Sequence, residues 1–270
     1  MLAHILLLTV PASPPPPRTG FVDQAWTILQ AGAESKNSDE RAKAIHALAL
    51  LTANRKAQEM AEKSLADPNA NVRVEAATTL GQMGAFSARA KLRAVLEDKE
   101  AKVVVAAANA LFTLKDPAAY DVYYALLTGE RKSSNGMVQS ELDTLKDRKA
   151  VEKLALETGI GFVPFGGMGW EAWKTVTRDD TSPVRAAAAE KLARDPDPKS
   201  AEALAESCSD KKWRVRAAVV NAIAKRGDPG MLHDLEPLLE DSNDTVRFDA
   251  AAAVLRLSLM SETHPRGRAN

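Results

Sequence analysis

A short segment recurs along this chain, and its spacing constrains the fold more than any other feature. Each copy has an acidic turn, then a valine that is usually followed by arginine, then an alanine-rich run. The valines of successive copies are 31, 81, 31 and 31 residues apart. Repetition at a fixed period of about 20 to 50 residues is the signature of a solenoid or a similar array. The marker valines are Val72, Val103, Val184, Val215 and Val246.

A second landmark keeps the same register. Asp-Pro pairs begin at Asp116, Asp197 and Asp228, again 81 and 31 residues apart. Aspartate is a good N-cap and proline suits the first helical position, so each pair predicts the start of a second helix in its repeat. One helical hairpin cannot bury its apolar face alone, so neighbouring hairpins must stack. The sequence therefore predicts an all-α fold, a right-handed α-α superhelix of hairpins about 31 residues long with an irregular middle.

Composition supports helices and argues against a polyanionic partner. Aromatic residues make up only 5% of the chain, and alanine, the strongest helix former, is abundant. Lysine plus arginine and aspartate plus glutamate each number 36, so no net positive charge attracts nucleic acid. The single cysteine, Cys208, excludes an intramolecular disulfide and a cysteine-built metal site.

The order of aspartate, Val-Arg, alanine pairs, leucine and Asp-Pro resembles HEAT repeats, especially the shorter type named after phycobilisome lyases. The resemblance covers about residues 38–128 and 178–258. It implies a structural ladder of aspartate and arginine between adjacent repeats, interrupted at Val104, which stands where an arginine is expected. The ladder residues carried over are Asp67 with Arg73, Asp180 with Arg185, Asp210 with Arg216, and Asp241 with Arg247.

The chain divides into five regions. The leader contains the apolar stretch LAHILLLTV, which is too short to span a bilayer. It fits either an export signal, which would make the protein secreted or periplasmic, or a disordered leader of a cytoplasmic protein. The regions are a leader and proline-rich spacer at 1–20, repeats at 21–128, an insertion at 129–177, repeats at 178–260, and a tail at 261–270.

Candidate binding residues lie on the second helices of the repeats, which the resemblance places on the concave face. Aligning these helices by the period puts two tyrosines in register with two arginines, away from the leucine stripe. Tyrosine and arginine are frequent energetic anchors of protein interfaces. The alternative is that the tyrosines only fill a local packing defect. The candidates are Arg89, Arg93, Tyr120 and Tyr124.

The insertion contains a stretch without charge, GIGFVPFGGMGW, at 159–170. It lacks the pattern of a phosphate-binding loop and is too short to cross a membrane, although a shallow insertion fits. We expect its glycines to allow close packing while its aromatic residues fill space between irregular repeats, with partner binding as the alternative. The candidate surface residues are Phe162, Phe165, Trp170 and Trp173.

No catalytic or metal-binding motif is present in the sequence. The four histidines are dispersed and lack ligand spacing, so we expect no enzyme activity, no metal and no cofactor. The favoured function is a scaffold, monomeric, that binds a protein or peptide through its concave face. One alternative, which rests on the resemblance alone, is a bilin lyase-like or tetrapyrrole-handling protein. Another is an envelope-associated assembly scaffold.

Overall fold

A computed structural model describes residues 18–128 and 180–263 of the chain, and helices dominate both parts. The first part contains α1 (Arg18–Ala33), α2 (Ser38–Ala47), η1 (Leu48–Leu50), α3 (Arg55–Ser64), α4 (Ala70–Met83), η2 (Phe86–Ala88), α5 (Arg89–Val95), α6 (Ala101–Thr113) and α7 (Ala118–Thr128). The second contains α11 (Ser182–Leu192), α12 (Pro198–Ser207), α13 (Trp213–Arg226), η4 (Pro229–Met231), α14 (Leu232–Leu235), η5 (Glu236–Glu240) and α15 (Asp244–Thr263). Within these two parts, no helix has the length and apolar character needed to cross a membrane.

Helix boundaries follow the capping residues of the sequence. The side chains of Asn37 and Asn69 accept backbone N–H groups at the starts of α2 and α4, and Asp197 does the same for α12, which begins with proline. Gly84 and Gly227 end α4 and α13 with φ of 69° and 70°, a left-handed conformation that glycine adopts without strain. The Asp-Pro pair therefore marks a helix start, as the sequence predicts.

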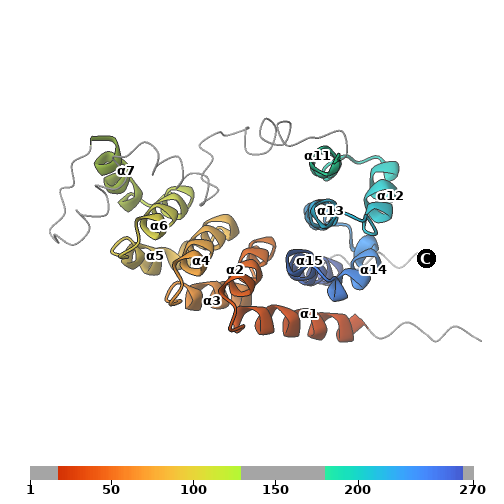
Figure 1. The fold of residues 1–270 in the computed structure, drawn as a ribbon, viewed down its shortest axis with the longest axis horizontal. Helices are drawn as coiled ribbons and strands as arrows, with labels where there is room; N and C mark the ends of the chain where they lie inside the picture. Colours follow the sequence, from red (N-terminus) through yellow and green to blue (C-terminus); the bar gives the residue numbers. More distant parts are fainter. Residues whose placement is uncertain (1–17, 129–179, 264–270) are drawn as a thin grey trace, which may run out of the picture.

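The helices form a two-layered arc, which confirms the predicted solenoid (Figure 1). The alanine-rich helices α2, α4, α6, α11, α13 and α15 lie on the inner side of the arc. Helices α1, α3, α5, α7, α12 and α14 lie on the outer side. The expectation that the second helix of each repeat lines the concave face is therefore wrong, because α3, α5, α7, α12 and α14 are those second helices.

Small side chains explain why the alanine-rich helices form the inner layer. A Cβ atom built on Gly81 of α4 would lie 2.9 Å from the Cα of Ala110 in α6, so the two backbones nearly touch. Alanine and glycine allow such close approach. A layer of closely spaced helices is shorter along the arc than a layer of bulkier helices. It therefore lies on the inside of the curve.

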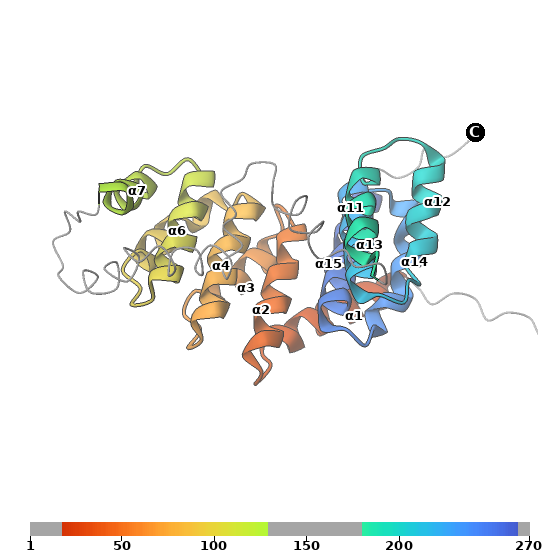
Figure 2. The ribbon, with the colours of Figure 1, turned by 45° about the horizontal axis from the view of Figure 1, so that its top comes forward.

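The order of helices in space differs from their order in sequence. The expected arrangement places the second array after the first, across the insertion at 129–177. In the structure α15, the last described helix, packs instead against α1 and α2 at the beginning of the chain (Figures 1 and 2). The inner layer therefore runs α11, α13, α15, α2, α4, α6, and α1 covers α15 and α2 from outside.

One hydrophobic core continues through the place where the two arrays meet. Its buried members include Ala25 and Leu29 of α1, Ile45 of α2 and Phe248 of α15. The Phe248 ring lies so close to Gly32, in the last turn of α1, that a Cβ there would be 2.4 Å from the Cε1 atom. Gly32 is therefore a steric requirement of the contact between the arrays.

We predict that Gly32→Ala lowers the free energy of unfolding by roughly 1–3 kcal/mol, because the added methyl group overpacks the contact with Phe248. Gly20→Ala in the same helix is the matched control, since no atom lies within 4 Å of its Cβ position. The control is expected to leave stability unchanged or slightly raised. Urea denaturation of the two variants measures the difference, and equal effects would contradict the proposed packing.

Candidate binding surface on the inner layer

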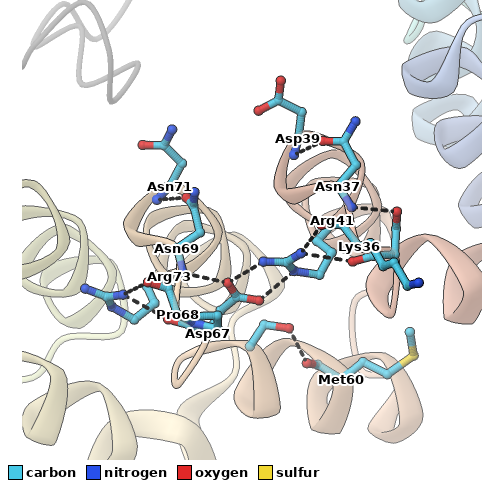
Figure 3. Close-up of polar contacts among 12 residues, drawn as sticks. Lys36, Asn37, Asp39, Arg41, Met60, Asp67, Pro68, Asn69, Asn71 and Arg73 are labelled. Carbon is cyan, nitrogen blue, oxygen red and sulfur yellow. Dashed lines mark hydrogen bonds and ion pairs between the residues drawn. The ribbon is translucent and has the colours of Figure 1, made fainter.

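Within each array, ion pairs connect neighbouring repeats along one edge of the solenoid, and Figure 3 shows the pair between Arg41 and Asp67. The guanidinium of Arg41 donates two hydrogen bonds, both 2.8 Å long, to the carboxylate of Asp67 in the following repeat. Arg73 likewise donates bonds of 2.7 and 2.8 Å to Asp98. The same arrangement joins Arg185 to Asp210 and Arg216 to Asp241 in the second array.

Each ladder arginine can also hold the turn of its own repeat. The Nη1 atom of Arg73 donates to the backbone carbonyl of Asp67 at 2.9 Å, and Arg216 and Arg247 make the equivalent bond to Asp210 and Asp241. Thus one guanidinium fixes the turn before its helix and the aspartate of the next repeat.

The predicted partners within one repeat therefore differ from the observed ion pairs. Asp67 pairs with Arg41 and not with Arg73, whose carboxylate partner is Asp98. Asp180 accepts the backbone N–H of Ser182 at 3.0 Å. Arg41 and Asp98 were missing from the predicted ladder, although their positions one period from Arg73 and Asp67 could have revealed them.

Most of these pairs are largely buried, although Arg185 is 44% exposed. The Arg73 side chain is 8% exposed and its partner Asp98 is 13% exposed. Burial alone favours the neutral acid, yet hydrogen bonds from Arg41 and from the N–H of Asn69 lower the pKa of Asp67 below its usual value. The Arg41–Asp67 pair therefore stays ionised, as bidentate arginine-carboxylate geometry favours.

The ladder changes at α6, where Val104 is buried in the position of the arginine. Nearby, Arg93 of α5 donates bonds of 3.1 and 2.6 Å to the fully buried carboxylate of Asp116. Hydrogen bonds from Arg93, opposed by burial, lower the pKa of Asp116. Arg93, predicted to bind a partner, thus also fixes the start of α7 through Asp116, which accepts the N–H of Ala118.

The predicted tyrosine and arginine cluster lies on the outer layer. Tyr120 and Tyr124 are 47% and 62% exposed, and their ring centroids lie 6.3 Å apart. Tyr120 also meets Phe112 edge-to-face at 5.8 Å. Arg89 lies over the Phe86 ring and donates to the Phe86 carbonyl at 3.2 Å. The structure therefore brings the tyrosines together with Phe112, but on α7 and not on the inner side.

The inner layer carries a stripe of polar side chains that the sequence analysis missed. Asn71 and Glu75 of α4 lie one and two turns along the same helix face, and equivalent positions on the neighbouring helices are also polar. Each member stands two residues before, two residues after or five residues after the ladder position of its helix, so the period could have revealed the set. The members, which we call the inner stripe, are Asp39, Lys43 and His46 of α2, Asn71, Glu75 and Thr78 of α4, Lys102 and Asn109 of α6, Arg214 and Asn221 of α13, and Asp249 of α15.

Hydrogen bonds join members of the inner stripe on neighbouring helices. Lys102 donates to the Asn71 side chain at 2.6 Å, and the Nδ1 atom of His46 lies 3.0 Å from the Glu75 carboxylate. The hydrogen bond to Glu75 raises the pKa of His46, although burial opposes it. These contacts orient the side chains and leave several of their polar atoms facing the solvent.

Asp249 is the buried member of the inner stripe. Its side chain accepts one hydrogen bond, 2.9 Å from the amide of Asn221, and the residue is only 4% exposed. Burial raises the pKa of Asp249 to about 6, while the charge of His46 and the Asn221 hydrogen bond act in the opposite direction. An ionised carboxylate at this position is therefore costly.

Cys208 has the properties of a core residue. It is 8% exposed, and burial followed by the charge of Asp234 raises its thiol pKa to about 12. Such a thiol is a poor nucleophile. In the two described parts of the chain, no group of three or more histidine, cysteine, aspartate or glutamate side chains could hold a metal ion.

The aromatic residues predicted to form a surface in the insertion, Phe162, Phe165, Trp170 and Trp173, lie outside the described residues. The leader also lies outside them through residue 17.

Comparison with known families identifies the repeats. The family model for HEAT repeats matches residues 26–111, 59–132 and 171–256, which is more than half of the chain. The chain therefore belongs to the HEAT repeat family. No curated protein matches the sequence at a significant level.

Several solved structures resemble the chain over most of its length. An engineered protein covers 88% of this chain and 97% of its own, with 17% identity and a TM-score of 0.31. Human deoxyhypusine hydroxylase in complex with glycerol covers 89% and 98%, with 16% identity and a TM-score of 0.32. A designed armadillo repeat protein covers 88% and 98%, with 16% identity and a TM-score of 0.29. TM-scores this low carry no argument about function.

We predict that Arg73→Met lowers the free energy of unfolding by roughly 3 kcal/mol, because Asp98 loses its counter-ion in a half-buried site. Arg55→Met is the matched control. It removes an ion pair with Glu59 whose side chains are 92% and 60% exposed, so it should leave the urea midpoint unchanged. A similar loss in both variants would show that the ladder adds nothing beyond a surface pair.

We predict that Asp249→Asn stabilises the protein increasingly as the pH rises. The folded pKa of about 6 exceeds the ordinary value of 3.8, so the stability contributed by this group is complete below pH 3.8 and is lost as the pH approaches 6. Asparagine keeps the bond from Asn221 without this loss. Urea titrations from pH 4 to pH 8 should show a difference from wild type that grows from near zero to about 3 kcal/mol at most. A difference independent of pH would contradict the assignment.

Proposed function

We propose that this chain is a non-catalytic HEAT repeat scaffold that binds a protein or peptide partner along its inner layer. The observation that carries the proposal is the inner stripe. Its members recur one repeat apart on α13, α2, α4 and α6, whereas its member on α15, Asp249, is buried. A periodic row of donors and acceptors on a curved solenoid suits an extended segment of a partner, whose backbone groups also recur at regular intervals.

The chemistry of the inner stripe favours a polypeptide over a polyanion. Basic members such as Lys102 and Arg214 occur together with acidic members such as Asp39 and Glu75, and with amide side chains. The whole chain has equal numbers of acidic and basic residues. Mixed charges with amide side chains can match a peptide of either sign, whereas a nucleic acid requires a continuous basic surface.

The aromatic cluster of Phe112, Tyr120 and Tyr124 is a second candidate surface. These side chains are partly exposed and lie at the end of the arc on α6 and α7. Exposed aromatic rings can anchor a partner at low entropic cost. Because the cluster is on the outer layer, it would contact a different part of the partner from the inner stripe. The insertion residues and the envelope-associated role remain predictions, and no observation in the described residues favours tetrapyrrole handling.

A photo-crosslinking experiment tests which layer binds. A photoreactive amino acid is placed at Asn71 or Arg214 on the inner stripe, and at Arg55 or Ala90 on the outer helices, all of which are exposed. After irradiation in the native organism, we expect specific protein adducts only from the inner positions, which mass spectrometry identifies. The variant Tyr120→Ala/Tyr124→Ala should leave these adducts in place. Adducts only from the outer positions would overturn the inner-layer proposal, and loss of the adducts in the tyrosine variant would favour the aromatic cluster.

A further inference from the structure

The junction where α15 meets α2 differs from the other described steps of the inner layer between α11 and α6, each of which is crossed by a ladder ion pair. Arg247 of α15 makes the usual bond to its own turn, to the carbonyl of Asp241 at 2.8 Å. Its second contact, however, is Asp244 in the same helix at 2.6 Å. The ladder position ahead of α2 is Ser35, which has no carboxylate. The ladder therefore does not cross the junction.

A change in helix direction gives a second reason why no ladder pair crosses the junction. In Figure 1, α11, α13 and α15 are seen end-on, whereas α2, α4 and α6 lie obliquely. The inner helices thus change direction between α15 and α2. Equivalent positions on these two helices do not meet as they do within an array, so the ladder geometry is lost.

Two polar contacts replace the ladder at the junction. Lys43 of α2 lies 3.4 Å from the Asp244 carboxylate, with side chains that are 41% and 28% exposed, so this pair is weak. Arg256 of α15 donates to the carbonyl of Leu50 at 2.9 Å and to the Thr52 hydroxyl at 3.2 Å. Its Nε atom also donates to the carbonyl of Ala224 in α13 at 2.8 Å. One guanidinium thus connects both arrays at the carboxyl-terminal ends of their helices.

A buried charge weakens the junction further. Among the described residues, three side chains of the acidic and basic amino acids are buried. Arg73 and Asp116 each have an oppositely charged partner within hydrogen-bond distance, whereas Asp249, beside the junction, accepts only the amide of Asn221. The remaining contacts are apolar packing of α15 against α1 and α2, including Phe248 on Gly32, and apolar contacts are non-directional. Such an interface resists separation more than it resists rotation.

We propose that the α15–α2 junction is the hinge of the arc, and that Arg256 is the latch that sets its opening. Rotation at this point moves the two arrays as units, because the ladder ties the repeats within each array. It changes the curvature of the inner layer. The hinge is a property of the free protein and does not depend on the proposed partner.

Distances between spin labels in the full chain test the hinge. Labels at Gln82→Cys in α4 and Lys225→Cys in α13, both exposed positions, report across the junction in a Cys208→Ala background. Labels at Arg55→Cys and Glu97→Cys report within the first array. Double electron-electron resonance should give a broader distance distribution across the junction than within the array. Equal widths would overturn the proposal.

Substitutions then distinguish the role of Arg256 at the junction from a general effect on stability. Arg256→Met should broaden or lengthen only the cross-junction distribution, whereas Arg185→Met, which removes a ladder pair of the second array outside the labelled helices, should leave it unchanged. Equal broadening in both variants, or none in Arg256→Met, would refute the latch. If circular dichroism shows that Arg256→Met is unfolded, Lys43→Met serves instead and should broaden the same distribution to a smaller degree. No broadening in Lys43→Met would then count against the hinge.

Discussion

Close approach of the alanine-rich helices is the constraint on which the rest of this structure depends. At Gly81 and Ala110 the backbones of α4 and α6 are so close that no larger side chain fits. This spacing places the alanine-rich helices on the inside of the curve and the bulkier helices outside. It also brings the ends of adjacent inner helices within reach of one guanidinium, so that Arg41 and Arg73 can each connect two repeats.

The same close spacing aligns side chains of neighbouring helices on the inner surface. His46 and Glu75, or Lys102 and Asn71, meet because their helices lie side by side in a constant register. The inner stripe is thus a direct product of the packing that forms the core. A surface built by repetition suits a partner that is itself extended, and this is the physical basis of the proposed scaffold function.

The junction shows what happens where repetition stops. The two arrays pack through Phe248, Gly32 and the apolar face of α1, but the helix direction changes and Ser35 replaces the ladder aspartate. Arg256 bonds to Leu50, 206 residues away in the sequence, and performs part of the connecting role of the missing ladder pair. The shape of the inner surface therefore depends on a contact that has no equivalent inside either array.

The sequence by itself determined the helical repeat, its period, the capping positions and most of the ladder residues, because these are local or recur at one fixed spacing. With the resemblance to HEAT repeats, Asp67, Arg73 and Arg216 could be named as ladder residues. Their ion-pair partners could not, because Asp98 and Arg41 belong to adjacent repeats, and the pattern does not show which neighbour a guanidinium reaches.

Only the tertiary structure decided which layer is inner, where Tyr120 and Tyr124 lie, and that α15 meets α1 and α2. Which layer is the inner one depends on the summed volumes of facing side chains. The contact of α15 with α1 and α2 depends on complementary surfaces about 200 residues apart in the sequence. Neither property follows from the repeat period of the sequence. The burial of the Asp249 carboxyl likewise results from the contact between the two arrays, because its surroundings exist only when both arrays are in place.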